Sequence, residues 1–140
     1  MPQKIREIMT PNPVMLNVNA TVGEAAQTMR DRDIGCILVT DASNRLCGLV
    51  TDRDLVVRGV AEGKDPRVTT LQEVCSEAIT ELTPDDTVDN AIKLMAKKHI
   101  RRIPIMEGAR PVGVLSLGDL ALERDPDSVL SRISSAAPNN

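Results

Sequence analysis

The stretch GLVTDRDL (residues 48–55) returns later in the chain as GVLSLGDL (residues 113–120). Both stretches begin with glycine, continue with two aliphatic residues and a small hydroxyl residue, and end with aspartate and leucine. Internal repetition has to be settled before a fold is predicted, because it decides how many structural units the chain contains.

The similarity extends well beyond the two stretches. TVGEAAQTM (residues 21–29) aligns with TVDNAIKLM (residues 87–95), and four of the nine positions are identical. IGCILV (residues 34–39) aligns with IRRIPI (residues 100–105). The chain therefore contains two copies of one sequence repeat.

The starts of the copies agree as well, since IREIMT (residues 5–10) aligns with LQEVCS (residues 71–76). Each copy spans about 60 residues, and two copies are too few for a solenoid. We therefore expect a pseudo-twofold pair that shares one core. The predicted organisation is a first domain, a linker, a second domain and a tail, at residues 3–62, 63–70, 71–124 and 125–140.

Sequence signals in the first copy predict a long amphipathic helix. Thr21 followed by Glu24 forms a capping box, which is typical of a helix start. Helical spacing then predicts a helix at residues 21–32, with one apolar face made of Val22, Ala25, Ala26 and Met29. The second copy repeats this face with Val88, Ala91, Ile92 and Met95.

The rest of the copy predicts strands and a second helix. Two apolar runs at residues 36–40 and 45–51 flank the turn sequence DASN, which predicts a β-hairpin. Residues 52–62 then read as a helix closed by glycine. With a short extended piece at residues 13–17, each copy is predicted to fold as β-α-β-β-α, an α/β (α+β) architecture.

The composition excludes several classes of function. The chain has 140 residues, a net charge of -3 and no Phe, Tyr or Trp. Such a chain has no excess of positive charge to attract nucleic acid, and no aromatic side chains on which bases could stack. No apolar run approaches the roughly 20 residues of a membrane span, and MPQKIREIMTP lacks a secretory apolar region. We expect a cytoplasmic protein without nucleic-acid or membrane partners.

Catalysis and metal binding are not expected either. Three cysteines without C-x-x-C spacing and a single histidine, His99, suit neither a disulfide framework nor a zinc site. The cysteines are predicted to be small core residues. No nucleophile–base pair is evident, so no reaction class can be assembled and no cofactor is required.

The repeated phrase has two interpretations. Thr51 and Ser116 end a strand where a helix begins, so their hydroxyls can cap that helix, and Asp54 and Asp119 then favour its dipole. The same junction also gathers free amides into an anion site. There the hydroxyl can bond a phosphate and the aspartate can accept from ribose hydroxyls. The residues alone leave both interpretations open.

With these features, the chain resembles the CBS-domain pair, or Bateman module, over about residues 3–124. The resemblance rests on MTP (residues 9–11), TVGEAAQTM, DIGCILV, RRIPI and the two hydroxyl-x-x-Asp phrases. It is closest to short stand-alone bacterial members, including the hypoxic response proteins of actinobacteria. These share the pattern LTDRD…GLAAG, seen here as LVTDRDLVVRGVAEG.

The resemblance implies a regulatory, energy-sensing module that binds AMP, ADP, ATP or S-adenosylmethionine in two clefts between the copies. Asp54 and Asp119 match ribose-binding aspartates, and Thr51 and Ser116 match phosphate-contacting hydroxyls. Arg102 matches a basic phosphate ligand, whereas its counterpart Cys36 cannot act as one. Backbone near the first strand and the hairpin entrance would hold adenine, at Pro13, Val14, Ile34 and Gly35 in one cleft and Ile79, Thr80, Ile100 and Arg101 in the other.

Several of these residues have a plainer interpretation. Arg101 and Arg102 can be solvated hairpin charges, Arg53 is expected to be exposed rather than bound to phosphate, and His99 is expected to interact with a helix dipole. The second copy begins with CSEAI where the first has MTPNP, which alters the second base pocket.

The rival to a nucleotide sensor is a dimeric structural or interaction module that binds no nucleotide. The presence of both aspartates and both hydroxyls favours binding. The resemblance also implies a homodimer that would act on a separate effector protein. We expect the dimer to form through the amphipathic helices at residues 21–32, 52–62, 87–98 and 117–124, because large exposed apolar faces are rare on monomers.

Overall fold

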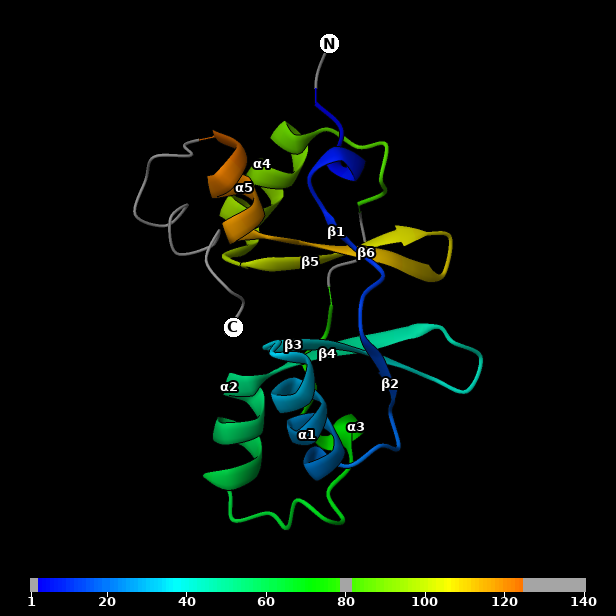
Figure 1. The fold of residues 1–140 in the computed structure, drawn as a ribbon, viewed down its shortest axis with the longest axis vertical. Helices are drawn as coiled ribbons and strands as arrows, with labels where there is room; N and C mark the ends of the chain where they lie inside the picture. The colour runs from blue at the N-terminus through cyan, green and yellow to red at the C-terminus, as the bar shows by residue number, and fades with distance from the viewer. Residues whose placement is uncertain (1–2, 79–81, 125–140) are drawn as a thin grey trace. The chain divides into compact units, whose positions relative to one another are not determined.

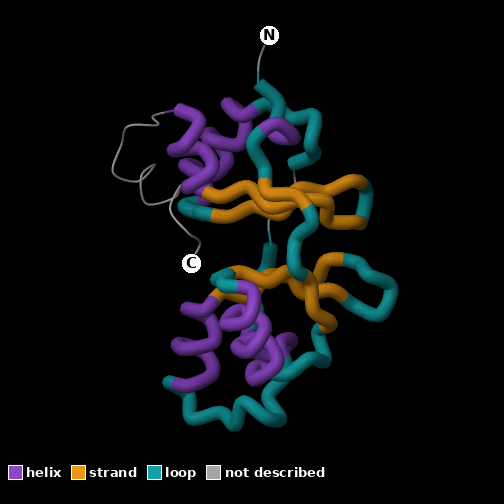
Figure 2. The backbone as a smooth tube through the Cα atoms, viewed as in Figure 1, coloured by secondary structure: helices purple, strands orange, loops and turns teal. Residues whose placement is uncertain are grey.

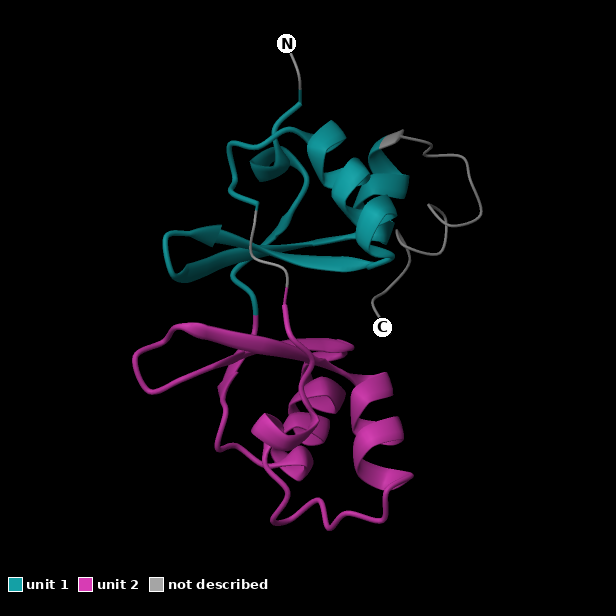
Figure 3. Ribbon diagram, turned by 180° about the vertical axis from the view of Figure 1, so that it is seen from behind, with its two compact units in different colours: residues 1–13, 79–138 teal, residues 14–78, 139–140 magenta. Residues whose placement is uncertain are grey.

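The structure, a computed structural model, describes residues 3–78 and 82–124. These residues form two compact units, each with its own sheet and helices (Figure 3). Residues 3–13 and 82–124 form unit 1, and residues 14–78 form unit 2. Among the described helices, none has the length and apolar character of a membrane span.

Unit 2 contains the first β-α-β-β-α pattern (Figure 1). Its sheet has the order β2-β3-β4, with β2 parallel to β3 and β3 antiparallel to β4. The strands are β2 (Met15–Asn17), β3 (Cys36–Thr40) and β4 (Leu46–Thr51). The helices are α1 (Val22–Arg32), α2 (Asp52–Asp54), its continuation η2 (Leu55–Val60) and α3 (Leu71–Val74). The predicted mixed α+β fold is confirmed.

Unit 1 repeats the hairpin and its two helices. Its sheet has the order β1-β6-β5 and is antiparallel throughout. The strands are β1 (Thr10–Pro11), β5 (Arg102–Glu107) and β6 (Arg110–Ser116). The helices are η1 (Ile5–Glu7), α4 (Val88–Lys98) and α5 (Leu117–Arg124). The extended segment expected before α4 involves residues 79–81, which lie outside the described residues.

The long helices begin and end as the sequence predicts. The Thr21 hydroxyl accepts from the Glu24 amide and the Glu24 carboxylate accepts from the Thr21 amide, both at 3.1 Å. This capping box fixes the start of α1. The same helix ends at Asp33 with a left-handed backbone (φ 55°), and α4 ends in the same way at His99. His99 is therefore a C-terminal cap, where a helix dipole favours positive charge.

Each unit has its own hydrophobic core, so the expectation of one shared core is wrong. The physical reason is that the helices of each unit bury the apolar face of their own sheet (Figure 2). In unit 1 the core is Ile5, Leu82, Val88, Ala91, Met95, Ile103, Ile105, Leu115 and Leu120. In unit 2 it is Val22, Ala25, Met29, Ile37, Val39, Val50, Leu55, Leu71 and Val74.

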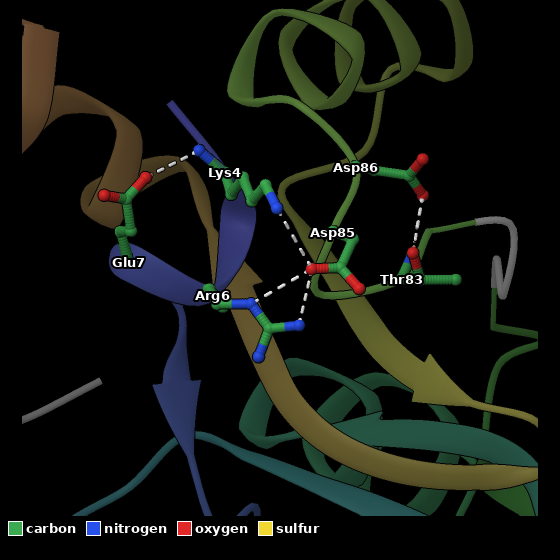
Figure 4. Close-up of polar contacts among 6 residues, drawn as sticks. All are labelled: Lys4, Arg6, Glu7, Thr83, Asp85 and Asp86. Carbon is green, nitrogen blue, oxygen red and sulfur yellow. Dashed lines mark hydrogen bonds and ion pairs between the residues drawn. The ribbon is translucent and has the colours of Figure 1, made fainter. Parts of the chain in front are cut away.

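The two repeats exchange their opening segments. Ile5 from the first repeat is buried in the core of unit 1, while Leu71 and Val74 from the second are buried in that of unit 2. Ion pairs also hold the opening segment of the first repeat in unit 1, because Lys4 and Arg6 both pair with Asp85 (Figure 4). The two compact units therefore do not coincide with the two predicted repeats at residues 3–62 and 71–124, because each unit contains residues of both.

Three side chains are exposed where the sequence predicts burial, and Cys36, also predicted to be a core residue, is only half-buried. Ala26 and Ile92, assigned to the buried faces of the long helices, are exposed because the cores cover a narrower stripe. Cys47 is exposed as well, although a core position was predicted. Side chains alternate along β4, and Cys47 lies on the face opposite the buried Gly48 and Val50.

Candidate functional site

The repeated phrase forms a strand-to-helix junction in each unit. In unit 2 the Thr51 hydroxyl accepts from the Asp54 amide at 3.2 Å, and Oδ2 of Asp54 accepts from the Thr51 amide at 2.9 Å. In unit 1 Ser116 and Asp119 make the same reciprocal pair, at 3.1 and 2.8 Å. The capping interpretation is therefore correct for both phrases, and it uses one carboxylate oxygen of each aspartate.

The hairpins place further predicted residues beside these junctions. Arg102 lies directly opposite Ser116 in the antiparallel pair of β5 and β6, and Cys36 lies opposite Thr51 in the pair of β3 and β4. Side chains at directly opposed positions point to the same face of a sheet. The two junctions are thus matched in geometry, while a cation at one replaces a thiol at the other.

The backbone before each hairpin also lies at the junction. The Asp52 amide donates to the Gly35 carbonyl at 3.1 Å, and the Leu117 amide donates to the Arg101 carbonyl at 2.8 Å. Ile34 and Ile100 precede these residues and pack against the core of their own unit. The structure therefore brings together the hydroxyl, the aspartate and the hairpin entrance that were predicted from sequence.

The Asp54 carboxylate has additional partners that the sequence did not reveal. Its side chain is only 14% exposed, and its Oδ1 accepts from the Ser76 hydroxyl at 3.4 Å. The Arg58 guanidinium lies 4.0 Å from the same oxygen and donates to the Cys75 carbonyl. Arg58 follows Asp54 by four residues, a spacing that signals a helical ion pair. Ser76 belongs to the opening segment of the second repeat, and it lies at this site because that segment packs in unit 2.

The Asp119 carboxylate has a different environment. Burial raises its pKa above the ordinary value, and its bonds with Ser116 only partly oppose that shift. Within the described residues, Oδ1 of Asp119 makes no hydrogen bond or ion pair. This oxygen is a hydrogen-bond acceptor with reduced solvation and no protein partner from the described chain.

Five residues predicted at the site remain: Pro13, Val14, Arg53, Ile79 and Thr80. Arg53 is exposed, as expected. Val14 packs against the core of unit 2 and its carbonyl accepts from the Leu38 amide, whereas Pro13 belongs to unit 1. Ile79 and Thr80 lie outside the described residues. In the described part of the chain, no group of three or more His, Cys, Asp or Glu side chains could hold a metal ion.

The CBS domain family model matches residues 5–59 and 71–124, which include both junctions. The chain belongs to the CBS-domain family. Its two matches make it a CBS pair, as the resemblance implied.

Two relatives of this CBS pair match it over most of their length. It is 38% identical to the uncharacterized protein YlbB of Bacillus subtilis, over 94% of this chain and 91% of that protein. It is 32% identical to hypoxic response protein 1 of Mycobacterium tuberculosis, over 83% of this chain and 81% of the relative.

Solved structures share the fold. Hypoxic Response Protein I, crystallised with two coordinated zinc ions, matches with a TM-score of 0.76 at 31% identity, covering 85% of this chain and 97% of that one. The CBS domain pair of protein MJ0100, in complex with 5-methylthioadenosine and S-adenosylmethionine, matches with a TM-score of 0.80. Its identity is 22%, over 91% of this chain and 100% of that chain, so this likeness concerns the fold.

Proposed function

We propose that this CBS pair is a non-catalytic, cytoplasmic regulatory module that binds adenosyl nucleotides through its two strand-to-helix junctions. Ribose hydroxyls donate to Asp54 and Asp119, and phosphate or another anionic group accepts from the hydroxyls of Thr51 and Ser116 and from Arg102. Adenine lies against the hairpin entrances at Ile34–Gly35 and Ile100–Arg101. The module acts as a homodimer and passes its signal to a separate effector protein.

The main support for this proposal is that the second carboxylate oxygen of Asp119, Oδ1, has no partner among the described residues. A helix cap needs one carboxylate oxygen, and the bond between the Ser116 amide and Oδ2 supplies it. Oδ1 is left partly buried and without a described partner, which is costly for a charged acceptor. A vicinal diol from a ribose supplies the missing hydrogen bonds.

Shared fold supports the choice of ligand class. MJ0100, a protein of the same fold, was crystallised with two adenosyl compounds. The present chain lacks aromatic residues, so it must hold a base by backbone and aliphatic contact. The hairpin entrances provide both, because Ile34 and Ile100 precede the carbonyls that receive the helix amides.

The alternative is a CBS module that serves only as a structural or interaction unit. The environment of Asp54 favours it in part, because Ser76 and Arg58 already engage the second oxygen of this carboxylate. In that case the repeated phrase does no more than finish two helices.

Near-ultraviolet absorbance separates the two functions. The chain has no Phe, Tyr or Trp, so a nucleotide that copurifies with it is visible without protein background. We expect either an adenine spectrum in the purified protein or heat on titration of the stripped protein with AMP, ATP or S-adenosylmethionine. No adenine absorbance and no heat with any of the three would favour the structural alternative.

A further inference from the structure

A short segment of unit 1 beside the junction of Ser116 and Asp119 is strongly basic. Residues 97–102 run from the last turn of α4 to the first residue of β5, and we call them the basic segment. Its four cations are Lys97, Lys98, Arg101 and Arg102. The ion pairs of the described residues use other cations, namely Lys4, Arg6, Arg30, Arg58 and Arg67. The charge of the basic segment is therefore available to an anionic ligand.

The backbone places the basic segment at the start of α5. The Arg101 carbonyl accepts from the Leu117 amide at 2.8 Å, and Arg102 lies directly opposite Ser116 in the pair of β5 and β6. Lys98, the last residue of α4, precedes Arg101 by three positions and is exposed. The cations thus flank the helix start at which the hydroxyl of the junction lies.

The corresponding segment of unit 2, residues 31–36, has no excess of positive charge. It contains two aspartates and one arginine, and Cys36 takes the position of Arg102. The nearby cation on η2, Arg58, is already engaged, because it donates to a backbone carbonyl and lies 4.0 Å from Oδ1 of Asp54. The two junctions therefore share their hydroxyl and aspartate but differ in the charge around them.

The first turn of the helix differs in the same sense. In unit 2, Oδ1 of Asp52 accepts from the Arg53 amide at 2.9 Å. The Arg53 side chain is exposed and follows this carboxylate in the sequence. Unit 1 has Leu117 and Gly118 at these positions, and within the described residues the Gly118 amide donates to no side chain. Because amides at a helix start bind phosphate well, unit 1 keeps a donor that unit 2 has given to its own carboxylate.

We infer that the two junctions select adenosyl ligands of different charge, with a nucleoside triphosphate preferred in unit 1 and an adenosyl group with one phosphate or none in unit 2. This inference rests on the proposed function, in which the aspartate of each junction holds the ribose. In unit 1 the first phosphate accepts from Ser116 and Arg102. The second and third phosphates accept from the exposed cations of the basic segment, in charge-assisted bonds. In unit 2 each added phosphate meets the like charge of Asp52.

Calorimetric titration with adenosine, AMP and ATP in the absence of Mg²⁺ tests the two junctions separately. Asp54→Asn leaves the unit 1 junction intact, and Asp119→Asn leaves that of unit 2 intact. In Asp54→Asn we expect ATP to bind roughly 10- to 150-fold more tightly than AMP, the effect of one hydrogen bond to a charged group. In Asp119→Asn we expect ATP to bind more weakly than AMP or adenosine.

Two lysines outside the predicted adenine contacts test the role of the basic segment. Lys97→Gln with Lys98→Gln, added to Asp54→Asn, should bring the affinity for ATP close to that for AMP and leave the affinity for adenosine unchanged. Arg45→Gln with Arg110→Gln is the control, because it removes two exposed cations outside the basic segment and should keep the preference for ATP. Circular dichroism establishes that each variant is folded.

The matching change in unit 2 removes the carboxylate of its first helical turn. Asp52→Leu, added to Asp119→Asn, copies the residue at position 117 and should raise the affinity for ATP. The inference is overturned if unit 1 binds ATP and AMP equally, if the lysine variant keeps the full preference, or if unit 2 prefers ATP before Asp52 is changed. Equal binding of adenosine, AMP and ATP would leave the proposed function standing, whereas no binding of any of them by the wild type would overturn both.

Discussion

Asp54 and Asp119 make the same bonds to their helices and differ at their second oxygen. Asp54 shares that oxygen with Ser76 and lies near Arg58, whereas Asp119 has no described partner there. Burial raises the pKa of Asp119, and its hydrogen bonds with Ser116 only partly oppose that shift. A carboxylate that costs stability without a ligand is typical of a binding residue.

Replacing Asp119 by Asn should separate binding from stability. The folded chain holds the Asp119 proton more tightly than the unfolded chain, so the free energy of unfolding falls as pH rises through the interval between the ordinary and raised pKa values. Above that interval the carboxylate lowers stability. At neutral pH, urea denaturation should therefore show Asp119→Asn to be at least as stable as the wild type.

The advantage of Asp119→Asn should disappear in acid, where the wild-type carboxyl is protonated in both states. A variant that is clearly less stable at neutral pH would show that the charge of Asp119 serves the helix.

Arg102 should matter for ligands that carry phosphate. It lies opposite Ser116, where a guanidinium can make charge-assisted bonds to an anion. Such bonds are worth about 1.5–3 kcal/mol, so Arg102→Gln should weaken AMP binding at the unit 1 junction roughly 10- to 150-fold. Calorimetry with adenosine should show little change. Arg110→Gln, at the start of β6, is the control, and equal losses for AMP and adenosine would argue against a phosphate contact.

The glycine that opens each repeated phrase has a packing role. A Cβ atom on Gly48 would overlap the Ser76 carbonyl oxygen and lie 3.3 Å from Sγ of Cys75. A Cβ atom on Gly113 would lie 2.6 Å from Sδ of Met9 and 3.0 Å from the Thr10 carbonyl oxygen. In both hairpins, then, the opening segment of the other repeat crosses the strand where only glycine leaves room.

Substitution of two glycines by alanine should give opposite results. Gly48→Ala forces backbone apart and should lower the free energy of unfolding by about 1–3 kcal/mol. Gly59→Ala, within η2, meets only Cγ1 of Val22 at 3.7 Å and should raise it by about 0.4–1 kcal/mol. Urea denaturation of both variants provides the measurement. A stable Gly48→Ala would mean that Ser76 does not pair with Leu49 as described.

Local patterns predicted the helices and strands well, because their signals are short-range. The capping box at Thr21 and Glu24 sets the start of α1, and the turn DASN sets the hairpin between β3 and β4. The hydrogen bonding of η2 was not predicted. Its Val56 carbonyl accepts from the Ala61 amide five residues later, where an ordinary α-helix was expected.

The exchange of opening segments could not be predicted from either copy alone. Thr10 pairs with Val114, and Ser76 pairs with Leu49, so each contact joins one repeat to the other. The alignment of the starts shows that the two segments are equivalent, but it does not show which hairpin each one joins. Ser76 was missed at the candidate site for this reason.

Each unit is therefore a composite of both repeats. In unit 2, Asp54 from the first repeat accepts from Ser76 of the second. In unit 1, Ile5 from the first repeat fills a core made otherwise by the second. A single repeat would lack part of its core and, in unit 2, part of its candidate site. Both repeats of the chain are therefore needed to complete each folded unit.

Calorimetric titration of AMP into the wild type and the Asp54→Asn/Asp119→Asn variant tests the proposed nucleotide function most directly. Asparagine keeps an oxygen for each helix cap but removes the charge that accepts ribose hydroxyls. We expect AMP to bind the wild type and, in the folded variant, its affinity to fall roughly 10- to 150-fold at each junction, from the loss of about 1.5–3 kcal/mol. Undiminished AMP binding by the variant, or no binding by the wild type, would contradict the proposed function.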